Sequence, residues 1–173
     1  AGLRHNIGFL ARLCDQSDFR NGDVDTHLID RHLRALSEPP EQDRQIALLL
    51  AALYVLRIEQ RRQDKEAAGS KDTASPWRLK KGWRLFGQAQ EVVEFRMADG
   101  EPFSVRIIYT QDGFQMTIGQ SSFAVHGHIK SDGTIEASVD GTAYGAGSAA
   151  SGSHLDVILH GETFELTLVD PFH

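Results

Sequence analysis

The chain has 173 residues, of which 40% are hydrophobic and 24% are charged, the ordinary proportions of a soluble protein with one domain or one domain plus a fragment. Its formal net charge of -6 argues against nucleic acid as the main partner, because phosphate binding needs a basic surface. The one cysteine, Cys14, cannot close an intramolecular disulfide, which fits a reducing compartment, and the longest apolar run, Ile46–Leu56, is too short to span a membrane.

The first 38 residues show the spacing of apolar side chains that is typical of helices. Ile7, Leu10 and Cys14 follow a 3–4 residue spacing, and residues 28–36 resume it after a loop over residues 15–23. Because Cys14 falls on the apolar face, we expect it to be buried and inert. The helical pattern is already under way at the start and no initiator Met precedes it, so we expect the chain to be a piece of a longer protein.

A third helix is predicted over residues 41–66. Acidic side chains stand near its start and basic ones near its end, where the helix dipole favours each. Between them the run IALLLAALYVL is apolar on every face, whereas a surface helix shows a single apolar stripe. Another part of the protein must therefore enclose this helix, and we expect Leu49, Leu53 and Leu56 to lie in the core.

Residues 83–169 alternate apolar and polar side chains with the period of two that is typical of strands with one buried face. Turn signals, mostly Asp-Gly, separate the segments at 83–85, 92–97, 103–109, 114–118, 122–129, 134–140, 155–159 and 163–168. Successive hairpins favour an antiparallel meander, and closing it into a barrel removes its exposed edges. The predicted fold class is α+β, with N-terminal helices followed by a long apolar central helix wrapped by a roughly eight-stranded antiparallel barrel.

The residues alone favour a non-catalytic interaction domain. A helix in the lumen leaves little room for a ligand. His126 and His128 share one face of a strand, but they fall on its outer face and no nearby Cys, Asp or Glu completes a set of ligands, which favours surface histidines over a metal site. His32 is expected to be a core or capping residue. The glycine-rich stretch 145–153 lacks the lysine of a phosphate-binding loop and is expected to be a flexible loop.

Two other functional classes stay open. One is a ligand-binding barrel of the lipocalin or avidin type, which a cavity inside the barrel would support. The other is a metal-dependent hydrolase that uses His126 and His128, which bound metal would support.

The connection between the third helix and the first strand, residues 62–82, is long for a compact domain, and such loops are usually functional or disordered. The stretch SPWRLKKGWRL, residues 75–85, runs from its second part into the first predicted strand and holds both tryptophans among basic residues. Trp and Arg most often carry the binding energy of interfaces. We therefore expect a partner-binding set here, with Trp77 at the interface and Trp83 closer to the barrel mouth; the set is Pro76, Trp77, Arg78, Lys80, Lys81 and Trp83.

Two stretches resemble the alpha subunits of biotin-dependent acyl-CoA carboxylases. NIGFL…DFRNGDVDTHLIDRH (Asn6–His32) is similar to the carboxyl-terminal edge of their biotin carboxylase domain. SPW…GWRL (Ser75–Leu85), with the strands after it, resembles the BT linker domain that follows in 3-methylcrotonyl-CoA carboxylase. Departures from the family pattern at His5, at Gln16-Ser17 and at Lys81 keep geranyl-CoA and propionyl-CoA carboxylases as alternatives.

The resemblance implies a domain division and a set of partners. Residues 1–38 would be the edge of the biotin carboxylase domain, and residues 39–173 the BT domain, with helix 41–66, a hook loop over 62–82 and a barrel over 83–169. The implied partners are the carboxyltransferase (beta) subunit and the rest of the biotin carboxylase domain. The implied location is the cytoplasm, or the mitochondrial matrix in a eukaryote.

The resemblance also implies that the whole enzyme uses biotin, ATP and Mg to carboxylate an acyl-CoA. This chain contains neither the ATP-binding residues of that family nor a lysine flanked by methionines, which would carry biotin. We therefore expect the chain itself to be inactive and to hold no cofactor or metal, and we expect residues 1–38 to be its weakest part.

Overall fold

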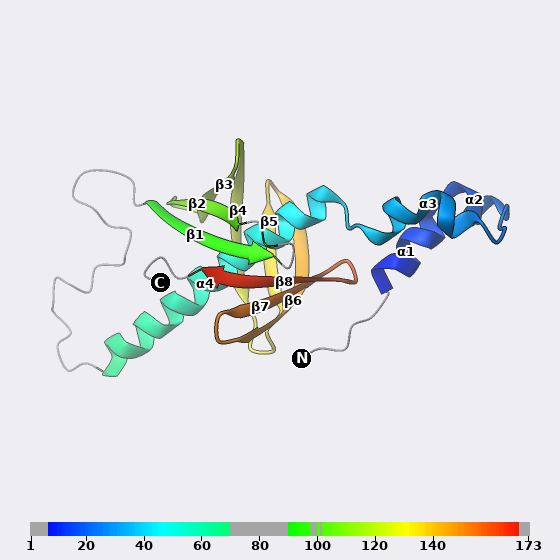
Figure 1. The fold of residues 1–173 in the computed structure, drawn as a ribbon. Helices are drawn as coiled ribbons and strands as arrows, with labels where there is room; N and C mark the ends of the chain where they lie inside the picture. Colours follow the sequence, from blue (N-terminus) through cyan, green and yellow to red (C-terminus); the bar gives the residue numbers. More distant parts are fainter. Residues whose placement is uncertain (1–6, 70–89, 98–99, 101, 170–173) are drawn as a thin grey trace.

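The computed structural model describes residues 7–69, 90–97, 100 and 102–169, and Figure 1 shows its fold. In these ranges, the helices precede the strands and are α1 (Ile7–Asp15), α2 (Ser17–Asn21), α3 (Leu28–Ser37) and α4 (Glu41–Gly69). The short helix α2 lies inside the segment predicted as a loop, and it ends at Gly22, whose φ of 81° places it in the left-handed region. Helix α4 ends later than the predicted residue 66.

The strands form a closed antiparallel barrel, in which each strand pairs with its neighbours in sequence and β8 pairs with β1. This confirms the predicted α+β class and the predicted antiparallel barrel of eight strands. The strands are β1 (Gln90–Met97), β2 (Pro102–Tyr109), β3 (Phe114–Ile118), β4 (Ser121–Ile129), β5 (Ile135–Val139), β6 (Thr142–Ser151), β7 (His154–Leu159) and β8 (Glu162–Val169).

Two of the hairpins turn on a pair of consecutive residues with positive φ, which suits the right-handed twist of the strands. Asp140 and Gly141 have φ of 49° and 83° between β5 and β6, at a predicted Asp-Gly turn. His160 and Gly161 have φ of 51° and 78° between β7 and β8. Here the turn lies one residue earlier than the predicted Gly161-Glu162 pair, because Glu162 already belongs to β8.

The structure corrects the prediction of a flexible loop at residues 145–153. Most of that stretch belongs to β6, which pairs with β5 on one side and β7 on the other, and Gly152 and Ser153 form the turn that follows. The strand was missed because its glycines, alanines and serines give no apolar alternation, while the hydrogen bonds of a sheet come from the backbone. The segment 83–85, predicted as a first strand, lies outside the described residues.

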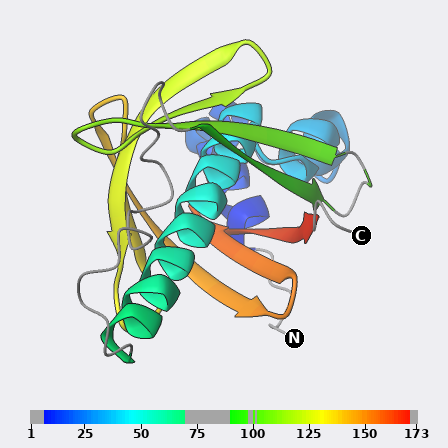
Figure 2. The same cartoon turned by 90° about the vertical axis from the view of Figure 1, so that its left-hand side faces the viewer.

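Helix α4 passes through the barrel, with strands around it in the view of Figure 2. Every residue from Ile46 to Leu53 is buried, and so is Leu56. They share one core cluster with inner-face residues such as Phe95 and Met116, and β2, β4, β5, β7 and β8 all contact the helix. Because a helix has about 3.6 residues per turn, a buried run of this length is enclosed on every side for about two turns.

The enclosed part of α4 is shorter than the helix, which has 29 residues. Leu49, Leu53 and Leu56 lie in the buried part. Arg57 is half-buried and Ile58 is exposed, so the polar end of α4 begins where the barrel wall ends. Helix α4 is therefore apolar where the barrel encloses it and carries its charged residues toward its two ends.

The two mouths of the barrel carry different elements. The amino mouth holds the first turn of α4, the turn His160–Gly161 and the lobe formed by α1–α3 (Figure 1). The carboxyl mouth holds residues 57–69 of α4 and the start of β1 at Gln90. The two ends of the domain are thus separated by the length of the barrel.

Leu53→Ala is expected to destabilise the protein by about 2–5 kcal/mol, because it leaves a cavity in a core that cannot collapse around the helix. The measurement is the free energy of unfolding from urea denaturation. Ile58→Ala is the matched control, because Ile58 lies on the same helix but is 41% exposed. Equal midpoints for Leu53→Ala and the unmodified chain would show that the core does not depend on α4.

Candidate functional site

The predicted partner-binding residues Pro76, Trp77, Arg78, Lys80, Lys81 and Trp83 lie outside the described residues. The structure describes the two elements that this segment connects, α4 before it and β1 after it. The end of α4 at Gly69 and the start of β1 at Gln90 both lie on the side of the carboxyl mouth (Figure 1). The side chains at this mouth therefore form the described part of the candidate site.

Arg57 anchors α4 to the barrel wall at the carboxyl mouth. Its Nε donates to the carbonyl oxygen of Gly127 at 2.9 Å, and its Nη1 donates to Oε1 of Gln60 at 2.8 Å. Its guanidinium also lies over the ring of Phe114, 5.2 Å from the ring centroid. Partial burial lowers the pKa of Arg57 from its ordinary value, although an arginine stays charged at any physiological pH. One turn further on, Arg61 donates to the carbonyl oxygen of Ile129.

These two arginines bond to β4 where β3 has ended. The pairing of β3 with β4 stops at Phe114 and Val125, while β4 runs on beside β5 to Ile129. Because backbone groups alternate sides along an antiparallel strand, the carbonyls of Gly127 and Ile129 point to the side that β3 has left. The guanidinium groups of α4 take the place of the missing strand there, so the helix itself closes this part of the wall.

The side chains of Arg57, Arg61, Phe114, Tyr109 and Glu91 form a rim around the carboxyl mouth. Tyr109 lies on the side of Phe114 away from Arg57. Its hydroxyl donates to Oε2 of Glu91 at 2.8 Å, and its ring packs edge-on against Phe114 with the centroids 5.4 Å apart. Burial, followed by the hydrogen bond to Glu91, raises the pKa of Tyr109 well above its ordinary value, so the phenol is a neutral donor at physiological pH. The rim is therefore a set of fixed hydrogen bonds that holds its shape.

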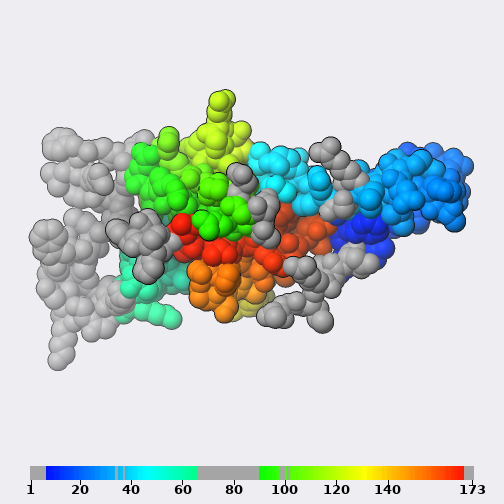
Figure 3. All heavy atoms as spheres, in the orientation of Figure 1, coloured from blue at the N-terminus to red at the C-terminus, as the bar shows by residue number. Residues whose placement is uncertain are grey.

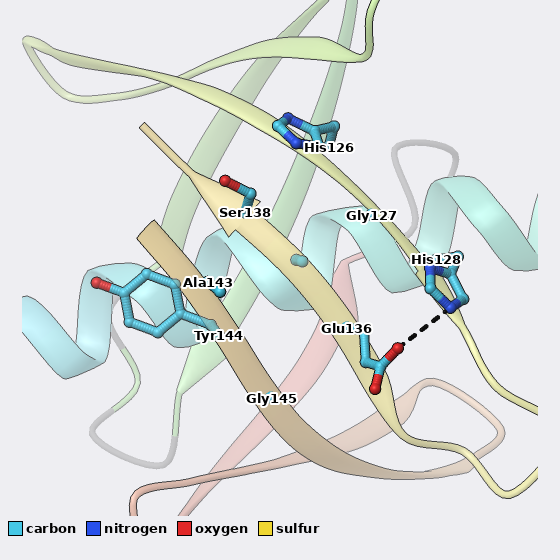
Figure 4. A pocket seen from close by; sticks show the side chains of 9 residues that line it. His126, Gly127, His128, Glu136, Ser138, Ala143, Tyr144 and Gly145 are labelled. Carbon is cyan, nitrogen blue, oxygen red and sulfur yellow. Dashed lines mark ion pairs between the residues drawn. The ribbon is translucent and has the colours of Figure 1, made fainter. Parts of the chain in front are cut away.

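A concave surface lies on the outside of the barrel over β4, β5 and β6 (Figure 4). His126 and His128 line it and are exposed on the outer face, where the alternation of β4 places them. Small residues of β6, such as Ala143 and Gly145, leave the surface hollowed. A side chain at Gly127 would collide with the carbonyl oxygen of Glu136, so this glycine allows β4 and β5 to approach closely here.

His128 has one carboxylate close to it in space. Glu136 lies opposite His128 in the strand register, with its Oε2 3.4 Å from Nε2 of His128. Its Oε1 lies 2.5 Å from Nζ of Lys130, and this ion pair raises the pKa of Lys130. Within the part of the chain that the structure describes, no three His, Cys, Asp or Glu side chains are grouped as a metal site.

The lobe of α1–α3 exposes many large apolar side chains. These are Ile7, Leu10, Phe19, Val24, Ile29 and Leu33. Cys14 is exposed as well, so the prediction that it is buried is wrong. The apolar face of α1 exists as predicted, but α2 and α3 do not cover it. Exposed apolar surface of this extent is typical of a protein interface.

Within the lobe, polar contacts hold α2 and α3 together. His32 on α3 lies with its Nε2 3.2 Å from Oδ2 of Asp18 on α2. The hydrogen bond to His32, followed by one from Ser17, lowers the pKa of Asp18. In the loop between the helices, Asp25 accepts two hydrogen bonds from Nη1 of Arg31, which lower its pKa as well. His32 thus bridges two helices, as a partly buried polar residue.

Comparison with known proteins gives one family and several relatives. Residues 44–171 match the family model described as the BT domain of the methylcrotonyl-CoA carboxylase alpha-subunit. The mitochondrial methylcrotonoyl-CoA carboxylase subunit alpha of Dictyostelium discoideum is 28% identical over 157 residues, which cover 83% of this chain and 22% of that protein. The Mus musculus subunit is 28% identical over 146 residues, covering 82% of this chain and 20% of that protein. The chain therefore spans about a fifth of the length of these relatives.

His32→Ala is expected to raise the pKa of Asp18 toward its ordinary value of 3.8, because the contact with His32 is the main cause of its lowered pKa. NMR titration of the Asp18 carboxyl carbon measures this directly. Asp25 is the matched control, since its pKa is lowered chiefly by Arg31 and should not move. Because the pKa of Asp18 is lowered in the folded chain, its contact adds stability above pH 3.8 that is lost as the pH falls through the folded value. An unchanged Asp18 titration in the variant would contradict the role of His32.

Proposed function

The chain belongs to the family of BT domains of methylcrotonyl-CoA carboxylase alpha subunits, and on this basis we propose that it is a non-catalytic assembly domain joining the alpha subunit to the carboxyltransferase (beta) subunit. The observation that carries the proposal is the extent of the family match. Residues 44–171 include the described strands β1–β8 and nearly all of α4. The barrel and α4 are therefore the elements to which we assign the function of the family domain.

The filled lumen supports an assembly role over a ligand-binding role. A barrel of the lipocalin or avidin type keeps its ligand in an open interior. Here inner-face side chains such as Phe95, Ile107 and Val157 pack in one core with the buried residues of α4. The space that a carrier would use for its ligand is occupied by the helix.

The hydrolase alternative finds little support in the histidine pair. His126 and His128 are exposed, and Glu136 is engaged with Lys130 on the outer face of the barrel. A catalytic metal needs three protein ligands and an open position, and the described residues offer no group of three. The proposal of an assembly domain therefore does not use these residues.

The two ends of the domain are proposed to face different partners. The lobe α1–α3, within residues 1–38, exposes the apolar surface that we assign to the rest of the biotin carboxylase domain. Residues 39–173 are assigned to the BT domain, and the hook loop over residues 62–82 to the beta subunit. The fixed rim of Arg57, Tyr109 and Glu91 supports this, because a rigid base lowers the entropy cost of presenting a binding segment.

The full-length protein is proposed to be a biotin-dependent acyl-CoA carboxylase that uses ATP and Mg, with 3-methylcrotonyl-CoA as its substrate and geranyl-CoA or propionyl-CoA as the alternatives. The relatives named above are methylcrotonoyl-CoA carboxylase subunits, which supports the first choice. No lysine of this chain has a methionine beside it, so we place the biotinyl lysine elsewhere in the full-length protein.

The relatives also bear on where the protein works. They are described as mitochondrial, which supports the matrix as the location in a eukaryote and the cytoplasm otherwise. None of the helices in the described ranges has the length and apolarity needed to cross a membrane.

Trp77→Ala is expected to weaken association with the beta subunit by about 2 kcal/mol or more, a typical cost at a residue that dominates an interface. The measurement is calorimetric titration of the variant alpha chain with the beta subunit, together with its thermal midpoint, which should stay close to that of the unmodified chain. Trp83→Ala is the matched control and is expected to lower the midpoint, because Trp83 is assigned to the barrel mouth. If Trp77→Ala lowers the midpoint while the affinity per folded molecule is unchanged, the assignment of Trp77 to the interface is wrong.

A further inference from the structure

The lobe α1–α3 and the barrel have separate cores. Leu28 and Leu36 are the buried large apolar residues of the lobe, while the core cluster of the barrel begins at Ile46. Figure 3 shows the lobe in blue at the end of the molecule, beyond the body of the barrel. Along the chain the two are joined by the short link at Pro39 and Pro40, between α3 and α4. Two bodies joined by one short link can pivot about it unless a second contact holds them.

Arg12 provides that second contact. Its Nε and Nη2 both donate to the carbonyl oxygen of Leu36, at 3.0 and 2.7 Å, which ties α1 to the end of α3. Its Nη1 donates to the carboxylate of Glu162 at the start of β8. The two side chains are only 18% and 22% exposed, so solvent screens their ion pair less than it screens a surface pair. A single guanidinium therefore connects α1, α3 and the barrel.

The surfaces around this contact fit closely. A side chain at Gly8 would overlap the carboxylate of Glu162, which would then have to move from its present position. A side chain at Gly161, whose φ is 78°, would lie 2.9 Å from Cγ2 of Ile7. The turn is held from its other side as well, because Nδ1 of His160 lies 3.2 Å from Oδ1 of Asp43 in the first turn of α4.

We propose that Arg12 is a latch that fixes the lobe α1–α3 on the turn between β7 and β8, so that lobe, α4 and barrel form one rigid spacer. The link at Pro39–Pro40 and the latch attach the lobe at two separate points, which removes the pivot that either point alone would allow. The direction in which α4 reaches the carboxyl mouth is then set relative to the lobe at the other end. This inference goes beyond the proposed subunit contact and does not depend on it, since the latch acts within this chain.

The test measures the distance between the lobe and the barrel. Cys14 is the one cysteine of the sequence and is exposed on α1, so it can carry a spin label. Ala149→Cys, on the exposed outer face of β6, provides the second label. Electron–electron double resonance on the doubly labelled chain is expected to give one narrow distance distribution. Arg12→Ala should broaden it severalfold, because the lobe then pivots about Pro39–Pro40.

Arg20→Ala is the matched control. Arg20 is an arginine of the same lobe, is 66% exposed and pairs with Asp15 within the lobe, so its loss should leave the distribution narrow. Glu162→Gln keeps the shape of the carboxylate but removes the ion pair, so it should broaden the distance distribution as well. It serves as the test variant if Arg12→Ala does not fold. A distribution that stays as narrow as in the unmodified chain in a folded Arg12→Ala or Glu162→Gln variant would overturn the proposal.

Discussion

A helix that is buried on every side needs a wall on every side, and the rest of this protein depends on that requirement. Residues 46–53 of α4 have no exposed face, and the barrel supplies side chains from strands on several sides of it. Each part buries the apolar surface of the other, because the side chains of α4 fill the inner face of the strands and the strands cover the helix. The shared core therefore fixes the position of α4 along the barrel axis, and with it the two ends of the helix.

This arrangement moves the working surfaces to the ends. The lumen is filled, and polar side chains lie at both mouths: Arg57 and Arg61 complete the wall of the barrel at one, and Arg12 holds the helical lobe at the other. The lobe exposes apolar side chains at one end, and the connection that carries both tryptophans leaves the other. Membership of the BT family and this two-ended construction support the same proposal, a domain that holds two partners at a set separation.

The sequence predicts those features of the fold that depend on side-chain periodicity. Seven of the eight strands have an alternating apolar pattern, and α4 is apolar on every face. These patterns predict a strand or a helix in each place, and the structure has it there. Strand β6 has small side chains and no such pattern, so only its backbone pairing reveals it. The exposure of Cys14 depends on which elements cover the face of α1. The approach of Glu136 to His128 depends on the register of β4 and β5. Neither can be predicted from the periodicity of side chains along one segment. The assignment of the hook-loop residues to the partner contact is based on composition and on the family resemblance.

The central claim is that this domain binds the beta subunit through the connection between α4 and β1. The most direct measurement is analytical ultracentrifugation of the chain mixed with the beta subunit, with and without replacement of residues 75–81 by a Gly-Ser linker of equal length, which leaves Trp83 in place. The account predicts a complex for the unmodified chain and none for the replaced chain, with similar thermal midpoints because the core of α4 and the barrel is unchanged. A complex that forms equally well after the replacement, or no complex with either chain, would contradict it.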